Sequence, residues 1–260
     1  AAGAWSLGAL PSAFLPFGRA RLGLPRPLRA EAAAEPAVVP ELPESAKAWA
    51  EKHFVDESKT MADNAYHIAP EELVEKAKSF LAMNNGFAGV EGGLMAEGFE
   101  FAGPVVGPLG KQRYLQSIAA TDFYKIFPDA NFQMYDFRVD PFEPNRVWFT
   151  SRGTGTQSGT DDGSPLFKTA TGKAYVNPPQ ACSIRFNRDG LVDQYTIGYV
   201  MDRRVGNTGG LGGFYGILHA VGKPFPFPEA QPWKPSLRMR LFNKLGDMMA
   251  AQKMKKTAGK

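Results

Sequence analysis

Two runs, Trp148–Gly159 and Ile184–Tyr195, constrain the fold of this sequence more than any other feature. Each reads as β-strand, in which alternate residues point to opposite faces of a sheet. The second run contains Asn187-Arg-Asp-Gly190, and Asp-Gly is a typical turn between two antiparallel strands. The sequence therefore predicts a sheet with at least one tight hairpin.

Strand-like runs follow helical ones along the chain, and this order predicts an α+β domain. The predicted strands lie at 131–140, 146–157, 179–187 and 191–201, with a polar loop at 160–173. Predicted helices precede them at 44–61, from Pro70 to a stop at 84–86, and at 111–127. The second helix has a stripe of 3.6-residue period made of Leu73, Ala77, Phe80 and Leu81. We interpret the Gly-rich residues 86–110 as structured turns, because the Walker spacing of a nucleotide site is absent.

Basic charge is concentrated at the two ends of the chain. Residues 1–30 carry four arginines and no acid, and residues 234–260 carry eight basic residues and one acid, Asp247. The remaining residues, 31–233, hold 18 basic and 25 acidic side chains, a net charge of −7. This distribution argues against a core that binds nucleic acid.

Residues 1–40 are rich in Ala, Pro, Leu and Arg and show no sustained periodicity, which suits a targeting leader or a disordered tail. The piece Pro11-Ser-Ala-Phe-Leu-Pro16 resembles the Ala-Phe cleavage motif of plastid leaders in algae with red-type secondary plastids. That resemblance implies a plastid (chloroplast) protein, soluble or peripherally bound to a membrane. The alternative is an ordinary disordered tail.

The chain changes character after Arg204, and residues 205–260 form a Gly- and Pro-rich strap with a terminal helix. A short helix is expected at 214–221, followed by extended Pro/aromatic segments at 224–228 and 231–235. A basic amphipathic helix is predicted at 236–253, with Leu237, Leu241, Leu245, Met248 and Met249 on one side. Such a helix suits an anionic membrane surface or a partner groove on a membrane protein complex; packing back onto the domain is the alternative.

Three local motifs, in their order along the chain, resemble the SnoaL-like branch of the NTF2-like superfamily over residues 70–204. They are Ile126-Phe-Pro-Asp-Ala-Asn-Phe132, Gly153-Thr-Gly-Thr-Gln-Ser-Gly159, and Phe186-Asn-Arg-Asp-Gly-Leu-Val192 with Asp202 after it. Residues 41–69 then read as an N-terminal helical extension. The resemblance implies a cone of helices packed on a curved antiparallel sheet, with a pocket for a small apolar ligand. It also implies that a homodimer can form through the outer face of the sheet.

The resemblance does not settle activity, because the family includes polyketide cyclases, isomerases, dehydratases and many non-enzymes. The family's strand histidine is replaced here by Gln157, which cannot titrate near neutral pH. Histidines 53, 67 and 219 lie outside the predicted strands and lack metal-ligand spacing. We find no sequence basis for a metal or a cofactor, and read the single cysteine, Cys182, as a buried strand residue.

Two carboxylates are candidate catalytic groups. Asp122 is flanked by aromatic residues, and a partly buried carboxylate can act as a general base; the alternative is a solvated Asp near Lys125. Asp202 matches the position of a frequent family acid, and an ion pair with the arginines that follow it explains it equally well.

The candidate ligand-binding residues lie mainly on the predicted strands. Alternation places Tyr195, Ile197 and Tyr199 on one face of the last strand. Arg152 can orient an anionic or carbonyl group, or pair across strands. The full set is Tyr114, Tyr135, Trp148, Arg152, Gln157, Tyr195 and Tyr199.

Two functions follow from these features. The first is a plastid protein that binds, or also isomerises or cyclises, a small apolar molecule. The second is a non-catalytic structural or assembly subunit docked on a photosynthetic membrane complex through residues 205–260.

Overall fold

The computed structural model describes residues 41–83 and 92–258. Those as far as Pro232 belong to one compact unit, and those from Trp233 onward belong to another. The helices of the first unit are α1 (Glu44–His53), α2 (Glu57–Asp63), α3 (Pro70–Met83), α4 (Lys111–Ala119), α5 (Phe123–Ile126) and α6 (Gly213–Ala220). Its strands are β1 (Met95–Ala102), β2 (Leu109–Gly110), β3 (Tyr135–Val139), β4 (Arg146–Ser151), β5 (Thr154–Thr156), β6 (Ala174–Val176), β7 (Gln180–Phe186) and β8 (Val192–Val200). Short 3-10 turns lie at Gly92–Leu94 and Pro228–Ala230.

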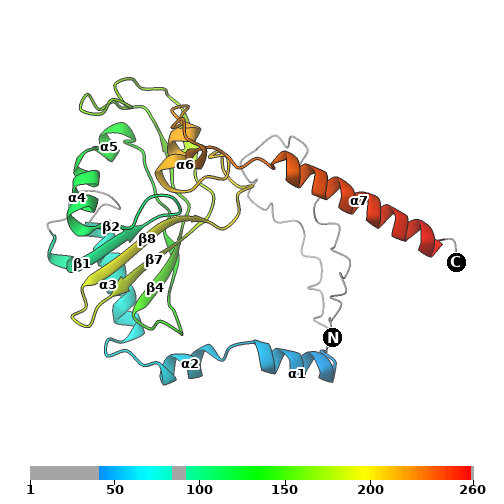
Figure 1. Ribbon diagram of the computed structural model, residues 1–260. Coiled ribbons are helices and arrows are strands. Elements are labelled where there is room, and N and C mark those ends of the chain that lie inside the picture. The colour runs from blue at the N-terminus through cyan, green and yellow to red at the C-terminus, as the bar shows by residue number, and fades with distance from the viewer. Residues whose placement is uncertain (1–40, 84–91, 259–260) are drawn as a thin grey trace, which may run out of the picture. The chain divides into compact units, whose positions relative to one another are not determined.

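Six strands form the main sheet, in the order β2-β1-β8-β7-β4-β3 (Figure 1). Its neighbouring strands are antiparallel except β1 and β8, which run parallel. The predicted hairpin joins β7 to β8: Gly190 has a φ of +72°, and the Asn187 side chain accepts from the N–H groups of Asp189 and Leu191. The predicted α+β class, with helices on a curved and mainly antiparallel sheet, is confirmed.

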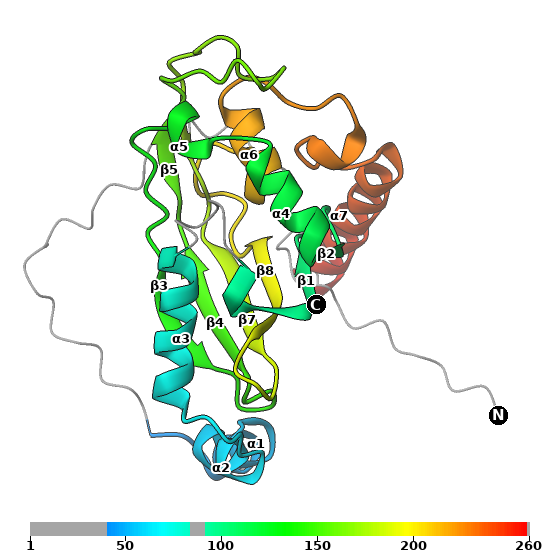
Figure 2. The same ribbon diagram turned by 90° about the vertical axis from the view of Figure 1, so that its left-hand side faces the viewer.

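Helices α3 and α4 cover the same face of this sheet (Figures 1 and 2). Helix α3 contacts β3 and β4, and α4 contacts β1 and β2. The apolar stripe predicted for α3 is confirmed, because its four residues are buried. Together with strand residues they form the first core: Leu73, Ala77, Phe80, Leu81, Met95, Phe99, Tyr114, Val139, Val147, Phe149, Cys182, Ile184, Phe186, Val192 and Tyr195.

The second core lies around the separate two-stranded sheet of β5 and β6. Its residues come from α5, from the loop before β6, from β6 and from α6: Phe123, Ile126, Phe127, Phe167, Tyr175, Ile217, Leu218 and Val221. Helix α6 contacts both β6 and β8, so the second core adjoins one end of the main sheet. Residues 205–232 thus pack within the same unit as the sheet.

Two predicted helices are each interrupted at a residue that caps a new helix. The helix predicted at 44–61 is in fact α1 and α2, and the Asp56 side chain accepts from the Lys59 N–H at the start of α2. The helix predicted at 111–127 is α4 and α5, with Asp122 capping α5. An aspartate at such a position offers the backbone a partner that a continuous helix does not need. The predicted stop of α3 at 84–86 lies outside the described residues.

The strand predictions also need correction. The run 146–157 is two strands that belong to different sheets, with the break at Arg152 and Gly153. The run 131–140 shortens to β3, where Asp136 adopts a φ of +59° and the register with β4 shifts. Strand β1 was missed because it lies in the Gly-rich segment, and its register with β8 is irregular after Met95. The alternation of side chains between the two faces predicts a strand poorly where the hydrogen-bonded ladder is irregular.

The second unit is built around α7 (Leu237–Ala258). Ser236 starts this helix: its hydroxyl accepts from the Met239 N–H and its carbonyl accepts from the Arg240 N–H. The predicted C-terminal helix is therefore confirmed and is longer than expected. None of the described helices is long and apolar enough to span a membrane.

Candidate ligand-binding cavity

A cavity of about 480 Å³ lies at the end of strand β8. One side is formed by β1, by the turn after it and by α4; the other is formed by residues 210–215, where α6 begins. The lining residues are Phe101, Gly103, Pro104, Val105, Val106, Leu109, Tyr114, Ser117, Ile118, Thr121, Phe123, Ile197, Gly198, Tyr199, Val200, Gly210, Leu211, Gly212, Gly213, Phe214, Tyr215 and Glu229. Residues of both cores thus contribute to one cavity.

A bulge in β8 shapes this end of the sheet. Thr196 pairs with Ser183 and Tyr199 pairs with Ala181, so β8 uses one residue more than β7 over the same span. Gly198 has a φ of +90° within the bulge. The extra residue reverses the alternation, which places Tyr199 on the same face as Thr196. The prediction that Tyr199 shares a face with Tyr195 is therefore wrong.

The bulge also lets the segment before α6 approach β8 closely. A Cβ on Gly198 would lie 3.1 Å from the Gly213 nitrogen, and a Cβ on Gly212 would lie 1.8 Å from the Gly198 oxygen. A side chain is therefore excluded at Gly212, and at Gly198 the φ of +90° together with the tight contact favours glycine. The same contact brings residues 210–213 into the cavity wall.

Aromatic rings form the wall on the side of the first core. The rings of Phe101 and Tyr114 stack with centroids 4.8 Å apart, and Tyr195 lies edge-on to both of them. Burial raises the pKa values of the Tyr114 and Tyr195 hydroxyls, so both remain neutral phenols at physiological pH. Phe101 and Tyr114 therefore offer an apolar and uncharged surface to the cavity, and Tyr195 supports them from the first core.

Polar groups in the lining are few. Among the described residues that line the cavity, Glu229 is the single charged one, and it is exposed. Hydroxyl groups come from Tyr114, Ser117, Thr121, Tyr199 and Tyr215. The arrangement can hold an apolar molecule and hydrogen-bond its polar substituents.

The two predicted catalytic carboxylates make other contacts. Asp122 is exposed and accepts from the Lys125 N–H as the N-cap of α5. Asp202 forms an ion pair with Arg204, whose side-chain hydrogen bonds, followed by its backbone one, lower the pKa of Asp202 to about 2. The ion-pair alternative for Asp202 is confirmed. Neither aspartate lines the cavity, and a catalytic role for either stays a prediction.

Of the seven predicted ligand-binding residues, Tyr114 and Tyr199 line the cavity. Tyr195 is buried in the first core behind Tyr114, and Tyr135 is exposed at the start of β3. Arg152 lies at the break between β4 and β5. These three residues, with Trp148 and Gln157, are not part of the lining.

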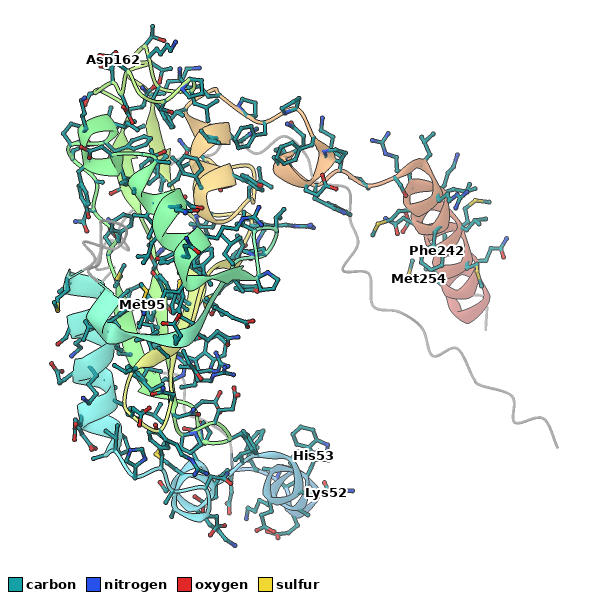
Figure 3. All side chains as sticks on the ribbon, turned by 60° about the vertical axis from the view of Figure 1, so that its left-hand side comes forward. Lys52, His53, Met95, Asp162, Phe242 and Met254 are labelled. Carbon is teal, nitrogen blue, oxygen red and sulfur yellow. The ribbon has the colours of Figure 1, made fainter. Side chains whose placement is uncertain are left out.

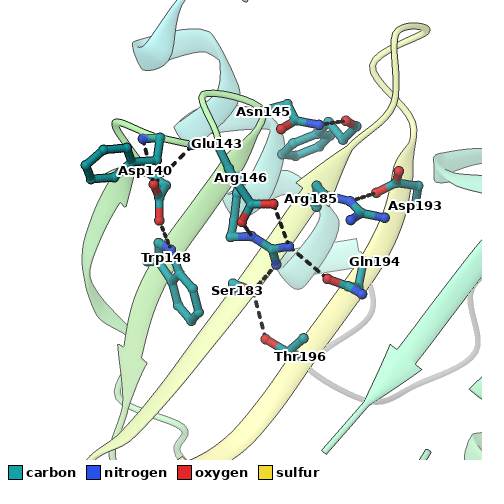
Figure 4. Close-up of polar contacts among 12 residues, drawn as sticks. Asp140, Glu143, Asn145, Arg146, Trp148, Ser183, Arg185, Asp193, Gln194 and Thr196 are labelled. Atoms are coloured by element: carbon teal, nitrogen blue, oxygen red, sulfur yellow. Dashed lines mark hydrogen bonds and ion pairs between the residues drawn. The ribbon is translucent and has the colours of Figure 1, made fainter. Parts of the chain in front are cut away.

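Trp148 lies on the face of the sheet away from α3 and α4, in a polar network (Figure 4). Its indole N–H donates to Asp140 at 2.7 Å. Arg146 lies beside it and donates to Ser183, Gln194 and the Glu143 carboxylate, and Ser183 contacts Thr196. A tryptophan held in this network stabilises the outer face of the sheet.

Gln157 is completely buried, and its side-chain amide is fully used by the backbone. Its nitrogen donates to the carbonyls of Gly159 and Thr169, and its oxygen accepts from the Thr171 N–H. This corrects the expected ligand contact, because the amide closes the loop between β5 and β6.

The segments at both sides of the cavity, 103–106 with its Gly-Pro pair and the glycine-rich 210–213, were not predicted as site residues, and neither was Glu229. The sequence signal of the two segments is their glycine and proline content, which marks unusual backbone but names no contact. The burial and high pKa of Cys182, raised by burial to about 12, agree with the predicted role as a strand residue. In the part of the chain that the structure describes, no group of three or more His, Cys, Asp or Glu side chains could hold a metal ion.

The fold and the cavity define an α+β protein with a largely apolar cavity. No family model and no curated protein matches the sequence. A protein from Jannaschia sp. CCS1 described as a SnoaL-like polyketide cyclase is 15% identical with a TM-score of 0.43, and the match covers 62% of this chain and 99% of that one. AclR of Streptomyces galilaeus, described as a hydroxylase, is 14% identical with a TM-score of 0.41, over 60% and 98% of the two chains.

An NTF2-like protein from Anabaena variabilis is 18% identical with a TM-score of 0.34, and that match covers 59% of this chain and 96% of that one. The SnoaL-like and NTF2-like names that the motifs suggested thus recur among the solved structures. The likeness is one of fold and says nothing of activity.

Proposed function

We propose that this chain binds a small apolar molecule in the cavity at the end of β8. The observation that carries the proposal is the lining: the cavity measures about 480 Å³, and its walls are aromatic rings, aliphatic side chains and glycine backbone. Cavities of this size and character are typical small-molecule sites. Burial of the ligand's apolar surface supplies the affinity, and the hydroxyl groups of the lining orient the ligand.

Binding is better supported than catalysis. Proton transfer needs a group that changes its protonation state near the operating pH. The buried Tyr114 has a raised pKa, and Asp202 has a pKa lowered to about 2. Glu229 is the carboxylate closest to a ligand, since it belongs to the lining. Isomerisation or cyclisation, which the family resemblance implies, therefore stays a prediction, and Glu229 is the only carboxylate among the described lining residues that could serve it.

The test is binding of N-phenyl-1-naphthylamine, a neutral apolar probe whose fluorescence rises in an apolar site. Ile118 lines the cavity from α4, so Ile118→Trp fills the space and should weaken probe binding by about tenfold or more. Gln112→Trp adds the same ring to an exposed position of α4 outside the lining and should leave binding unchanged. Equal binding by both variants would show that the probe does not occupy this cavity.

The predicted leader, residues 1–40, lies outside the described residues, and a plastid location stays a prediction. The second candidate function is a non-catalytic subunit docked on a photosynthetic membrane complex. It is favoured by the exposed apolar side chains of α7. Migration of the native protein with a large membrane assembly, rather than as a free monomer or dimer, would support this second function.

A further inference from the structure

Helix α7 presents large apolar side chains that the described structure leaves exposed. The exposed fractions of Leu241, Leu245 and Met249 are 60%, 51% and 70%. Figure 3 shows Phe242 and Met254 projecting from the helix, and both are exposed by about two thirds, at 65% and 68%. Exposed apolar side chains in such a density mark a surface that contacts something apolar.

The spacing of these residues gathers most of them on one face. Residues three or four positions apart are neighbours on a helix, and Leu237, Leu241, Leu245 and Met248 follow this spacing. Phe242 and Met249 extend the same face. Met239 and Met254 lie outside it. The stripe runs through about three turns of the helix, from Leu237 to Met249.

Charge identifies the kind of partner. Arg240 and Lys244 lie one turn apart on the flank of the apolar face, and Asp247 is the single acid between 234 and 260. That segment carries eight basic residues, so its net charge is +7. A helix with an apolar face and a cationic flank binds at the interface of a membrane that contains anionic lipid. Arg238 lies three and four positions before Leu241 and Phe242 and so falls within the apolar face, at the start of the helix, where its long side chain can reach the headgroups.

Length and polarity decide how the helix would lie. Its 22 residues are long enough for a span, but its polar residues exclude it from the helices that could cross a membrane. A helix in the plane of the interface buries one face in lipid and keeps its cations in water.

We infer that α7 is a membrane-surface anchor, in which Leu241, Leu245 and their neighbours enter an anionic lipid interface and Arg240 and Lys244 contact the headgroups. This anchor is independent of the cavity, because it uses residues of the second unit alone. The inferred partner of the C-terminal segment is thus a lipid surface and not a groove on another protein.

The test measures binding of the full chain to vesicles of phosphatidylcholine with and without phosphatidylglycerol. The chain should bind the anionic vesicles about tenfold or more tightly than the neutral ones, and added salt should weaken this binding. The double variant Leu241→Glu/Leu245→Glu should bind the anionic vesicles about tenfold or more weakly than the original chain.

The matched control places the same two charges on the opposite face. Asn243→Glu/Ala250→Glu lowers the net charge equally but leaves the apolar face intact, so it should bind the anionic vesicles more tightly than the first variant. If both variants lost vesicle binding equally, insertion of the apolar face would be overturned, and attraction between charges would be the sole cause of binding. Circular dichroism of both variants shows that α7 still forms.

Three further results would overturn the inference. One is no difference between anionic and neutral vesicles. Another is self-association of the free chain, measured by sedimentation, that Leu241→Glu/Leu245→Glu abolishes; the face would then bind a second copy. The last is strong protection of the α7 amides from hydrogen exchange in the free chain together with no vesicle binding, which would show that the helix packs within the protein.

Discussion

The two cores of the first unit are built by different means. In the first core, regular strands supply the backbone hydrogen bonds, as in the unbroken ladder of β4 and β7. In the second core, β5 and β6 have only three residues each, and polar side chains supply hydrogen bonds to the backbone groups there. Asn207 accepts from the Val176 N–H and donates to the Ala174 carbonyl, and the Asp129 carboxylate accepts from the Thr156 N–H.

The difference teaches how short elements become stable. Buried backbone groups need partners wherever they lie, and a two-stranded sheet leaves many of them unpaired. Polar side chains, the buried Gln157 and the exposed Asn207 and Asp129, then become part of the fold. The second core is also less completely satisfied: the buried Tyr175 hydroxyl has no hydrogen-bond partner among the described residues. We therefore expect it to open locally before the first core does.

Two phenylalanine truncations give the largest expected effects. Phe149 lies in the first core and Phe167 in the second, and both are buried. Phe149→Ala should lower the free energy of global unfolding by about 3–5 kcal/mol, because the cavity that it leaves is enclosed by regular elements. Phe167→Ala should lower it by less than half of that amount, since the loop around it can open locally.

Chemical denaturation of both variants measures these losses. Hydrogen exchange at the amides of β5 and β6 should accelerate strongly in Phe167→Ala and little in Phe149→Ala. Equal losses of stability with equal exchange at β5 and β6 would mean that the two cores unfold as one unit.

Removal of the Gln157 amide should have an intermediate effect. Gln157→Ala leaves the Thr171 N–H and the Thr169 carbonyl without this partner, at about 0.5–1.5 kcal/mol for each hydrogen bond lost, because both threonines are exposed. The matched control is Gln116→Ala, at an exposed position of α4. Hydrogen exchange at Thr171 and denaturation of both variants measure the effect. A loss no larger than that of the control would show that water replaces the amide.

Acid sensitivity should give the smallest effect, and each region has a carboxylate to test. Partial burial acts to raise the pKa of Asp140, but hydrogen bonds, chiefly from the Trp148 indole, together outweigh it and lower this pKa. The Thr156 N–H lowers the pKa of Asp129 in the same way. A pKa that is lower in the folded state stabilises the protein above the unfolded-state pKa, and this contribution disappears as the pH falls through the folded-state pKa.

Asp140→Asn and Asp129→Asn should therefore each reduce the loss of stability between pH 5 and pH 2, by less than about 1 kcal/mol because both carboxylates are largely accessible. Thermal unfolding across this pH range measures the change. Asp162→Asn, at an exposed loop position, is the control. An acid-range profile identical to that of the control in both variants would contradict the role of these hydrogen bonds.

How well the sequence predicted each region follows from how that region is held together. The stripe of α3 and the hairpin at Asn187-Arg-Asp-Gly190 depend on residues close in the chain, so periodicity and turn chemistry located them. The second core joins Phe127, Phe167 and Ile217, which are far apart in the sequence and lie on short elements or a loop. No local pattern brings such residues together.

The residues of the candidate site also differ in how well the sequence predicted them. Tyr114 and Trp148 were both predicted as lining residues because they are aromatic. Tyr114 lines the cavity from α4, whereas Trp148 lies on the other face of the sheet. One residue, Gly198, decides the position of Tyr199, because the bulge reverses the alternation. A bulge depends on the partner strand, which a single run of residues does not specify.

The sequence by itself determined the class of fold, the paired strands β7 and β8, the stripe of α3 and the basic C-terminal helix, because each depends on neighbours along the chain. Tertiary structure decided where the cavity lies and which groups face it. The cavity forms where β1, α4, the β8 bulge and residues 210–213 meet, and their contacts are set by backbone approaches as close as those of Gly198 and Gly212. Packing between distant segments, rather than any local preference, placed those surfaces together.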